Sequence, residues 1–307
     1  TYALYLGYQG VQFGSARVTL RTESDMERDM RTALLTLLLG GFALTGCGDK
    51  EDTGTSEEAD ADTDADTDAD TDADTDADAD VVSVDGCVAY DDGTAVSNKN
   101  VRVQMCNSSG CVPSFPDSSG CFNFPGLAPG SYAFDVVPTG KEAGHTYSTP
   151  LSLVTLESGQ GAWVLDDTVT IYTFTSDTDL AESTHSGDNG LTIQVDGSSF
   201  TGPLEDPDAD WMASVGVDPS AAGLPFGDIS GEVVAMWYMG PANADVGDWA
   251  FSVSGLGLTE GEQLQAYNAS YFGFEWVDIG TVTADASGIA HSDGGLKHLS
   301  TLILVRE

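Results

Sequence analysis

The chain has 307 residues, a length typical of about two domains. It carries 50 acidic against 10 basic side chains, a formal net charge of −40, and no Lys or Arg occurs between Lys141 and Lys297. This charge excludes ordinary nucleic-acid binding, which depends on clustered basic residues, and electrostatic docking on anionic lipid. The 36 glycines and the β-branched and aromatic runs favour strands and tight turns, so we expect an all-β protein.

The N-terminal segment has the pattern of an export signal. A short charged stretch at residues 26–31 precedes the apolar run Ala33–Leu44, which is shorter than the roughly 20 residues that span a bilayer. We expect a signal peptide at residues 26–46, with translation starting at Met26 or Met30 and residues 1–25 as an upstream extension without structure. A genuine N-terminal β segment is the alternative.

The apolar run ends in Leu44-Thr45-Gly46-Cys47, which resembles the lipobox of bacterial lipoproteins. The resemblance implies that the signal is cut before Cys47 and that this residue is acylated. Two or more acyl chains anchor a protein stably where one chain does not. Gly48 follows, where the resemblance associates Asp with inner-membrane retention. We therefore expect an exported protein, lipid-anchored in the bacterial outer membrane and facing the periplasm or the surface. A plain secretory signal with a spare cysteine is the alternative.

Residues 47–80 form an acidic linker after the acylated cysteine. Four Thr-Asp-Ala-Asp repeats begin at Thr63, Thr67, Thr71 and Thr75. No apolar residue larger than Ala is available to bury, and like charges repel, so we expect a disordered, extended tether that reaches at most roughly 110 Å. The repeated carboxylates favour weak cation binding, but the turn Gly and closing Glu of an EF-hand are missing.

Short alternating segments separated by turns predict a β-sandwich over residues 81–175. The expected strands are Val81–Tyr90, Asn100–Cys106, Cys121–Phe124, Ser131–Val137, Leu151–Leu156 and Trp163–Phe174.

Several motifs in this segment resemble the carboxypeptidase-regulatory-like (transthyretin-like) β-sandwich. They are Val84-Asp-Gly86, Asp92-Gly-Thr-Ala-Val96, Val101-Arg-Val103, Asp117-Ser-Ser-Gly-Cys-Phe122 and Leu127-Ala-Pro-Gly-Ser-Tyr132. The resemblance covers about 60 residues and implies a non-catalytic module of secreted and surface proteins, some of which hold glycans or partners. It transfers no catalytic or metal-binding residue.

The four remaining cysteines all lie in this segment, and an even cluster in an exported chain indicates disulfides. Strand parity places Cys87, Cys106 and Cys121 opposite the apolar face. Of the three possible connectivities we favour Cys106–Cys111 across a turn and Cys87–Cys121 between strands. A Cys₄ zinc site competes, but the spacing has no C-x₂-C knuckle.

Residues 176–307 lack a useful helix-period segment and predict a second β-sandwich of unknown type. The expected strands are Gly190–Val195, Gly231–Met239, Trp249–Val253, Gln263–Ala269, Glu275–Val282 and Leu299–Val305. The stretches Glu275–Gly288 and Gly295–Thr301 faintly resemble the closing strands of bacterial surface sandwiches.

The tripeptide His298-Leu299-Ser300 also resembles the cleavage site of GPCR autoproteolysis-inducing domains. The resemblance implies that His298 activates Ser300, whose hydroxyl attacks the carbonyl of Leu299, while the cut strand stays in place. The reaction needs a base beside a nucleophile and a strained peptide. A strand-start His and a surface Ser are the plain alternative.

Other site patterns are weak. The loop carboxylates Glu205, Asp206, Asp208 and Asp210 could hold calcium, or could form a solvated loop. Aromatic residues could build a glycan-stacking face or a core: Trp237, Tyr238, Trp249, Tyr267, Tyr271, Phe272, Phe274 and Trp276. The chain has no G-x-S-x-G, H-E-x-x-H, P-loop or dinucleotide-binding motif.

These observations favour a surface lipoprotein that displays a non-catalytic structural or interaction module on an acidic stalk, without a cofactor other than calcium. A carbohydrate- or ligand-binding surface protein is the first alternative. A hydrolytic or self-cleaving domain at residues 176–307 is the second. The expected partners are the membrane, through the lipid anchor, and a glycan or surface protein. The oligomeric state is left open.

Overall fold

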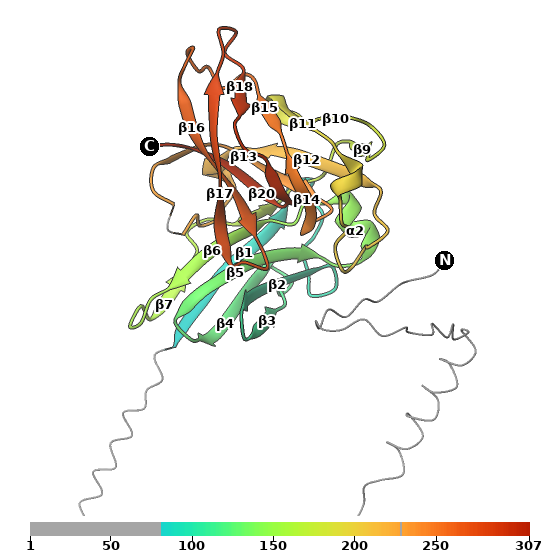
Figure 1. Cartoon of the computed structure of the whole chain (residues 1–307). Helices are drawn as coiled ribbons and strands as arrows, with labels where there is room; N and C mark the ends of the chain where they lie inside the picture. The colour runs from blue at the N-terminus through green and yellow to red at the C-terminus, as the bar shows by residue number, and fades with distance from the viewer. Residues whose placement is uncertain (1–80, 228) are drawn as a thin grey trace, which may run out of the picture. The chain divides into compact units, whose positions relative to one another are not determined.

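The computed structural model describes residues 81–307 except residue 228 (Figure 1). The expected signal peptide, Cys47 and the acidic linker lie outside the described residues. The predicted all-β class is confirmed, because strands dominate both halves and α2 (Lys141–Thr146) is a short helix. Within this described part, no helix is both long and apolar enough to cross a membrane.

The first half is a sandwich of two four-stranded sheets. One sheet has the order β4-β1-β7, with β8 also paired to β1, and the other has the order β3-β2-β5-β6. The strands are β1 (Val82–Tyr90), β2 (Val101–Asn107), β3 (Gly110–Ser114), β4 (Cys121–Leu127), β5 (Gly130–Pro138), β6 (Leu151–Leu156), β7 (Ala162–Val164) and β8 (Val169–Ile171).

The second half contains a ten-stranded sheet of order β10-β11-β15-β18-β17-β16-β20-β13-β12-β9 and a two-stranded sheet β14-β19. The strands are β9 (Asp177–Asp179), β10 (Thr184–Ser186), β11 (Leu191–Gln194), β12 (Trp211–Val217), β13 (Glu232–Gly240), β14 (Ala244–Trp249), β15 (Phe251–Val253), β16 (Gln263–Ser270), β17 (Glu275–Ala284), β18 (Ala290–Ser292), β19 (Leu296–Leu299) and β20 (Thr301–Arg306).

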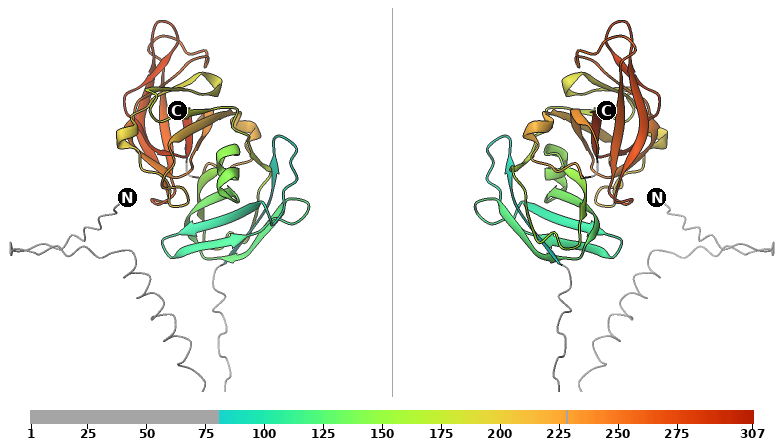
Figure 2. Two further views of the ribbon diagram at one scale, coloured as in Figure 1. Left: turned by 90° about the vertical axis from the view of Figure 1, so that its right-hand side faces the viewer. Right: turned by 90° about the vertical axis from the view of Figure 1, so that its left-hand side faces the viewer.

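The two halves share a hydrophobic core, and strand β20 of the second half is buried on both faces. On β20, Leu302 and Leu304 belong to the core of the second half, whereas Ile303 and Val305 pack with the first sandwich. Successive side chains of a strand point to opposite faces, so a strand buried on both sides needs an unbroken apolar run. The run Leu302–Val305 meets this need. Figure 2 shows the two groups of strands from opposite sides.

Three expected strands are interrupted where the chain changes its pairing. The expected strand Trp163–Phe174 divides into β7 and β8, which pair in parallel with the two ends of β1 on either side of a bend at residues 166–167. The expected strand Trp249–Val253 divides because β14 pairs with β19, whereas β15 pairs with β11 and β18. The expected strand Leu299–Val305 divides at Ser300, where the chain passes from β19 to β20.

Several strands carry no pattern that predicts them. The buried strand β12 contains Ala, Ser and Gly, which have little intrinsic preference for strands. The short strand β3 lies at a sheet edge and contains Pro113, a residue that sheets tolerate at edges.

Candidate functional site

The sheet β3-β2-β5-β6 turns a polar face away from the core of its sandwich. Its strand register places Gln104 opposite Asp135 and Arg102 opposite Val137. Because side chains alternate, these residues lie on the face opposite to Val101, Val103 and Met105, which are fully buried in the sandwich. Arg102, Gln104 and Asp135 therefore form a polar floor, which an isolated sandwich would expose to water.

The second half covers one end of this face. Tyr271 and Trp276 pack against a small buried cluster that includes Cys106 and Ala133 of the first half. The Tyr271 hydroxyl accepts a hydrogen bond from Gln104 Nε2 at 3.3 Å. It also lies 3.2 and 3.3 Å from the sulfurs of Cys106 and Cys111, to which a hydroxyl can donate. Tyr271 thus joins the polar floor to a disulfide.

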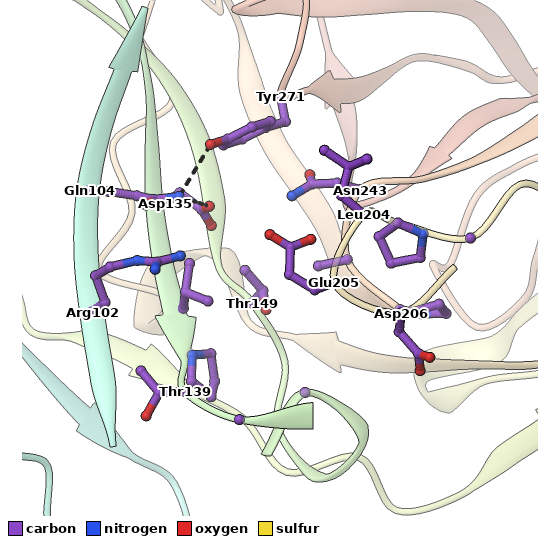
Figure 3. A pocket seen from close by; sticks show the side chains of 18 of the residues that line it. Arg102, Gln104, Asp135, Thr139, Thr149, Leu204, Glu205, Asp206, Asn243 and Tyr271 are labelled. Carbon is purple, nitrogen blue, oxygen red and sulfur yellow. Dashed lines mark hydrogen bonds between the residues drawn. The ribbon is translucent and has the colours of Figure 1, made fainter. Parts of the chain in front are cut away.

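Beyond this cover the polar floor opens into a pocket of about 800 Å³ between segments of the two halves. This volume is within the usual range for small-molecule sites. Figure 3 shows the polar floor on one side, with Glu205 and Asn243 pointing into the pocket from the other. Further lining residues include Thr139, Thr149, Thr201, Leu204, Asp206, Trp211, Asp245, Tyr271 and Phe272.

Asp135 is the buried acid of the polar floor. It is only 1% exposed, and its Oδ2 accepts a hydrogen bond of 3.0 Å from Gln104 Nε2. Its Oδ1 has no hydrogen-bond partner among the described residues. Burial raises the pKa of Asp135 to about 7 against the opposing effects of the Gln104 hydrogen bond and the Arg102 charge, and the Glu205 charge raises it slightly further. A buried carboxyl with a free oxygen is costly and is a frequent mark of a functional site.

Arg102 is the basic member of the polar floor. Its Nε is buried and has no hydrogen-bond partner among the described residues. Its guanidinium is close enough to Asp135 to lower the pKa of that carboxyl. The polar floor therefore presents a cation and a protonatable acid side by side.

Two exposed apolar side chains form the rim of the pocket. Leu204 is 84% exposed and Phe272 is 59% exposed, and both line the opening. Exposed apolar groups beside a pocket are typical of binding surfaces. Trp211 lies nearby, stacked on His145 with ring centroids 4.2 Å apart, and His145 Nε2 is 2.5 Å from Asp177 Oδ2.

The loop that carries Leu204 and Glu205 depends on glycine and proline. A Cβ on Gly202 would lie 2.7 Å from the carbonyl oxygen of Asp206, closer than real contacts allow. The Asp206 amide donates to the carbonyl of Pro203 at 3.0 Å, closing a turn that holds Glu205 toward the pocket. The sequence Thr-Gly-Pro-Leu-Glu-Asp-Pro thus encodes the presentation of both side chains.

The four carboxylates expected to hold calcium have different environments. Glu205 and Asp206 line the pocket, whereas Asp208 and Asp210 are not among its lining residues. In residues 81–307 without residue 228, no three acidic, His or Cys side chains gather in a group that could hold a metal ion. Calcium binding at this loop stays a prediction.

The His298–Ser300 pair makes its hydrogen bonds elsewhere. The Ser300 hydroxyl is buried, donates to the Ala269 carbonyl at 2.6 Å and accepts from Asn268 Nδ2 at 3.0 Å. His298 Nδ1 lies 2.7 Å from Asp245 Oδ1. These contacts tie Ser300, at the junction of β19 and β20, to strand β16. Autoproteolysis at Leu299–Ser300 stays an untested alternative.

A second histidine–serine contact has no counterpart in the sequence patterns. His185 is 1% exposed, with Nε2 at 2.8 Å from Ser214 Oγ and Nδ1 at 2.8 Å from Thr178 Oγ1. Burial lowers the pKa of His185, which favours a neutral ring with both nitrogens satisfied. None of the three residues lines the pocket described above, so we interpret the group as a buried structural contact.

Both disulfides connect directly opposed residues of antiparallel strands. Cys87 pairs with Cys121 between β1 and β4, and Cys106 pairs with Cys111 between β2 and β3. These are the two pairings that we favour from the sequence among the three possible ones. The sequence does not reveal that the outer face of Cys106 would be buried by the second half.

The aromatic residues considered for a glycan-stacking face mostly contribute to the cores. Trp237, Tyr238 and Trp249 are at most 2% exposed. Tyr271, Phe274 and Trp276 are half-buried between the halves, Tyr267 is half-buried, and Phe272 stands out as exposed. Of these eight residues, Phe272 is therefore the exposed one, and it lies at the rim of the pocket.

No protein-family model matches the chain, and no curated protein sequence matches it. Among solved structures it is similar to the TIE protein of Bacillus anthracis, with 10% identity over 73% of this chain and a TM-score of 0.24. That likeness covers 44% of the Bacillus chain, less than half of its length.

Two DUF3823 family proteins are also similar to this chain. The Bacteroides ovatus protein shows 12% identity over 74% of this chain and 82% of its own, with a TM-score of 0.22. The Parabacteroides merdae protein shows 12% identity over 57% and 92%, with a TM-score of 0.23. At these identities and TM-scores we take nothing about function from the three structures.

Proposed function

We propose that the protein is a displayed, non-catalytic binding module that takes a small ligand into the pocket between its two halves. One observation carries the proposal: the buried carboxyl of Asp135, one oxygen of which has no partner within residues 81–307 (residue 228 aside), lines a pocket with an exposed apolar rim. A polar group that is buried without a hydrogen-bond partner is costly. Proteins keep such groups chiefly at functional sites, where a bound molecule supplies the missing hydrogen bond.

The composition of the pocket fits binding. Ligand sites typically combine apolar walls with a few convergent polar groups that fix the orientation of the ligand. Here Leu204 and Phe272 supply apolar contact, and the polar floor supplies hydrogen-bonding groups of both kinds. The walls come from both halves, which share a hydrophobic core.

Display at the cell envelope is the second part of the proposal. Its support is the Leu-Thr-Gly-Cys motif ending at Cys47 and the Thr-Asp-Ala-Asp tract that follows it. The two disulfides agree with an oxidising compartment outside the cytoplasm. A glycan or a surface protein that presents a suitable small group is the expected partner.

Ligand binding can be tested with a pocket-blocking variant. The exposed side chain of Thr201 lines the pocket, so Thr201→Trp should fill it without disturbing a core. A thermal-shift screen of sugars, amino acids, amines and nucleosides should yield a compound that stabilises the full-length wild type and leaves Thr201→Trp unchanged. If every hit stabilises both proteins equally, the proposed binding site is wrong.

Display can be tested independently at the expected acylation site. Wild-type protein should enter the detergent phase and incorporate labelled palmitate, and Cys47→Ala should do neither. Equal membrane association and labelling of both proteins would contradict the lipid anchor.

A further inference from the structure

The charge of the pocket narrows the class of ligand, an inference that rests on the proposed binding function. Among the described lining side chains, Arg102 is the only Lys or Arg, whereas Asp135, Glu205, Asp206 and Asp245 are acidic. The whole chain also carries a formal net charge of −40. An anionic ligand would therefore meet repulsion both during approach and inside the pocket.

Two carboxyls face the same space from opposite walls. Figure 3 shows Asp135 on the strand side and Glu205 pointing in from the loop side. Asp135 has its free Oδ1 and is 1% exposed, while the exposed Glu205 is near enough to influence the titration of both Asp135 and Tyr271. Arg102 balances one of these two acidic groups and leaves the other without a Lys or Arg among the described lining residues.

The surroundings of these carboxyls suit an organic cation. The Tyr271 and Phe272 rings lie at the pocket with centroids 5.2 Å apart and nearly perpendicular planes. Aromatic faces attract ammonium groups, and the exposed Leu204 and Phe272 can cover an apolar substituent. A neutral polyol could form hydrogen bonds here but would leave the negative excess uncompensated.

We infer that the pocket binds a small organic amine, with its ammonium group between Asp135 and Glu205 and its apolar or planar part against Phe272 and Leu204. Such a group would give the buried Asp135 oxygen a charged donor, which no residue in the described part of the chain supplies. An amino sugar and an aromatic or aliphatic amine share this chemistry.

Matched probes can distinguish the charge requirement from the shape of the ligand. Phenethylamine, phenethyl alcohol and phenylacetate share a ring and differ in charge, and glucosamine and glucose form a second pair. Calorimetric titration of the full-length protein should show each amine binding at least about tenfold more tightly than its neutral counterpart. Whichever of the two amines binds more tightly, phenethylamine or glucosamine, indicates whether the ligand is an aromatic amine or an amino sugar.

Protein variants locate the effect. Glu205→Gln keeps the size of an exposed loop side chain and should weaken amine binding by about tenfold. Asp208→Asn removes a charge from the same loop outside the pocket and should change it by less than about twofold. Asp135→Asn should weaken amine binding by about the same factor as Glu205→Gln, about tenfold.

The inference and the proposed function fail in different ways. Neutral or anionic probes could bind as tightly as the amines while Thr201→Trp still blocks binding. This result would contradict the inference that the ligand is an amine, and it would be consistent with the pocket as the binding site. Equal weakening by Asp208→Asn and Glu205→Gln would also overturn the placement of the ammonium group. Failure of all probes, together with failure of the wider screen, would contradict both.

Discussion

Thr301 completes the hydrogen bonding of Leu151, a residue 150 positions earlier in the chain. The Thr301 Oγ1 donates to the Leu151 carbonyl at 2.6 Å and accepts from the Leu151 amide at 3.3 Å. Leu151 lies on β6, an edge strand whose outward backbone groups have no strand partner in its own sheet. A single side chain of the second half thus makes hydrogen bonds to both backbone groups of Leu151 at a buried sheet edge of the first half. The two halves are therefore linked by polar as well as apolar contacts.

Replacing Thr301 by Val should destabilise the whole described fold. The variant keeps the shape of the side chain but leaves a buried N–H and C=O of Leu151 unsatisfied, at a cost of about 1–3 kcal/mol. Chemical denaturation should show this loss in a single transition. Thr184→Val, at an exposed position, should stay within about 0.5 kcal/mol of wild type. Equal stability of the two variants would contradict the role of Thr301.

The two disulfides should contribute unequally to stability. Cys87–Cys121 joins residues 34 apart, whereas Cys106–Cys111 joins residues 5 apart. Because a longer closed loop restricts the unfolded chain more, loss of the first should cost about 3–4 kcal/mol and loss of the second about 2 kcal/mol. Paired Cys→Ser variants and urea denaturation measure both values. The reverse order would show that contacts at Tyr271 outweigh chain entropy.

Asp135 should make stability depend on pH between about 4 and 7. Burial raises its pKa in the folded protein from 3.8 to about 7. Across this window the folded state holds a proton that the unfolded state has lost, so stability falls as pH rises, and the full penalty is present above pH 7. The expected loss of unfolding free energy between pH 4 and pH 7 is of the order of a few kcal/mol.

The variant Asp135→Asn isolates this effect from the repulsion of the many other acids. Its stability relative to wild type should increase from pH 4 to pH 8, because the amide has no charge to bury and can still accept from Gln104. Denaturation of both proteins across this range gives the difference. A constant difference would mean that Asp135 titrates near its usual pKa.

The chain should remain intact at the Leu299–Ser300 bond. The Ser300 hydroxyl donates to the Ala269 carbonyl, and His298 contacts Asp245, so neither residue is arranged to activate the other. Mass spectrometry of denatured, purified protein should show no fragment beginning at Ser300. Such a fragment, lost in Ser300→Ala, would establish autoproteolysis in place of our structural interpretation.

Local alternation predicts most strands of the fold but not the points where they change partner. The pattern in Val101–Met105 identifies a strand with one apolar face, and β2 occupies that segment. Ser300, by contrast, separates two strands that pair with β14 and β13, far away in the sequence. A periodic pattern reports which face is buried, and it contains no information about the pairing partner.

The pocket is less predictable than the strands. Arg102, Gln104 and Asp135 read as the exposed face of an ordinary strand pair, because their covering residues lie more than 60 positions away in the chain. Glu205 and Asp206 stood out as an acidic loop, but the loop sequence cannot show that it faces Asp135. A polar residue that becomes buried only through a distant segment leaves no local signal.

The residue pattern by itself determined the all-β class, the sandwich of the first half and an even cysteine set, because these follow from alternation, turn residues and composition within short stretches. The sequence also carries the whole expectation of export and anchoring at Cys47. Only the tertiary structure decided that the two halves share a core, that β20 is buried on both faces and that Asp135 lies in a pocket. These features depend on which distant surfaces meet, and that choice is made by the combined free energy of packing the whole chain.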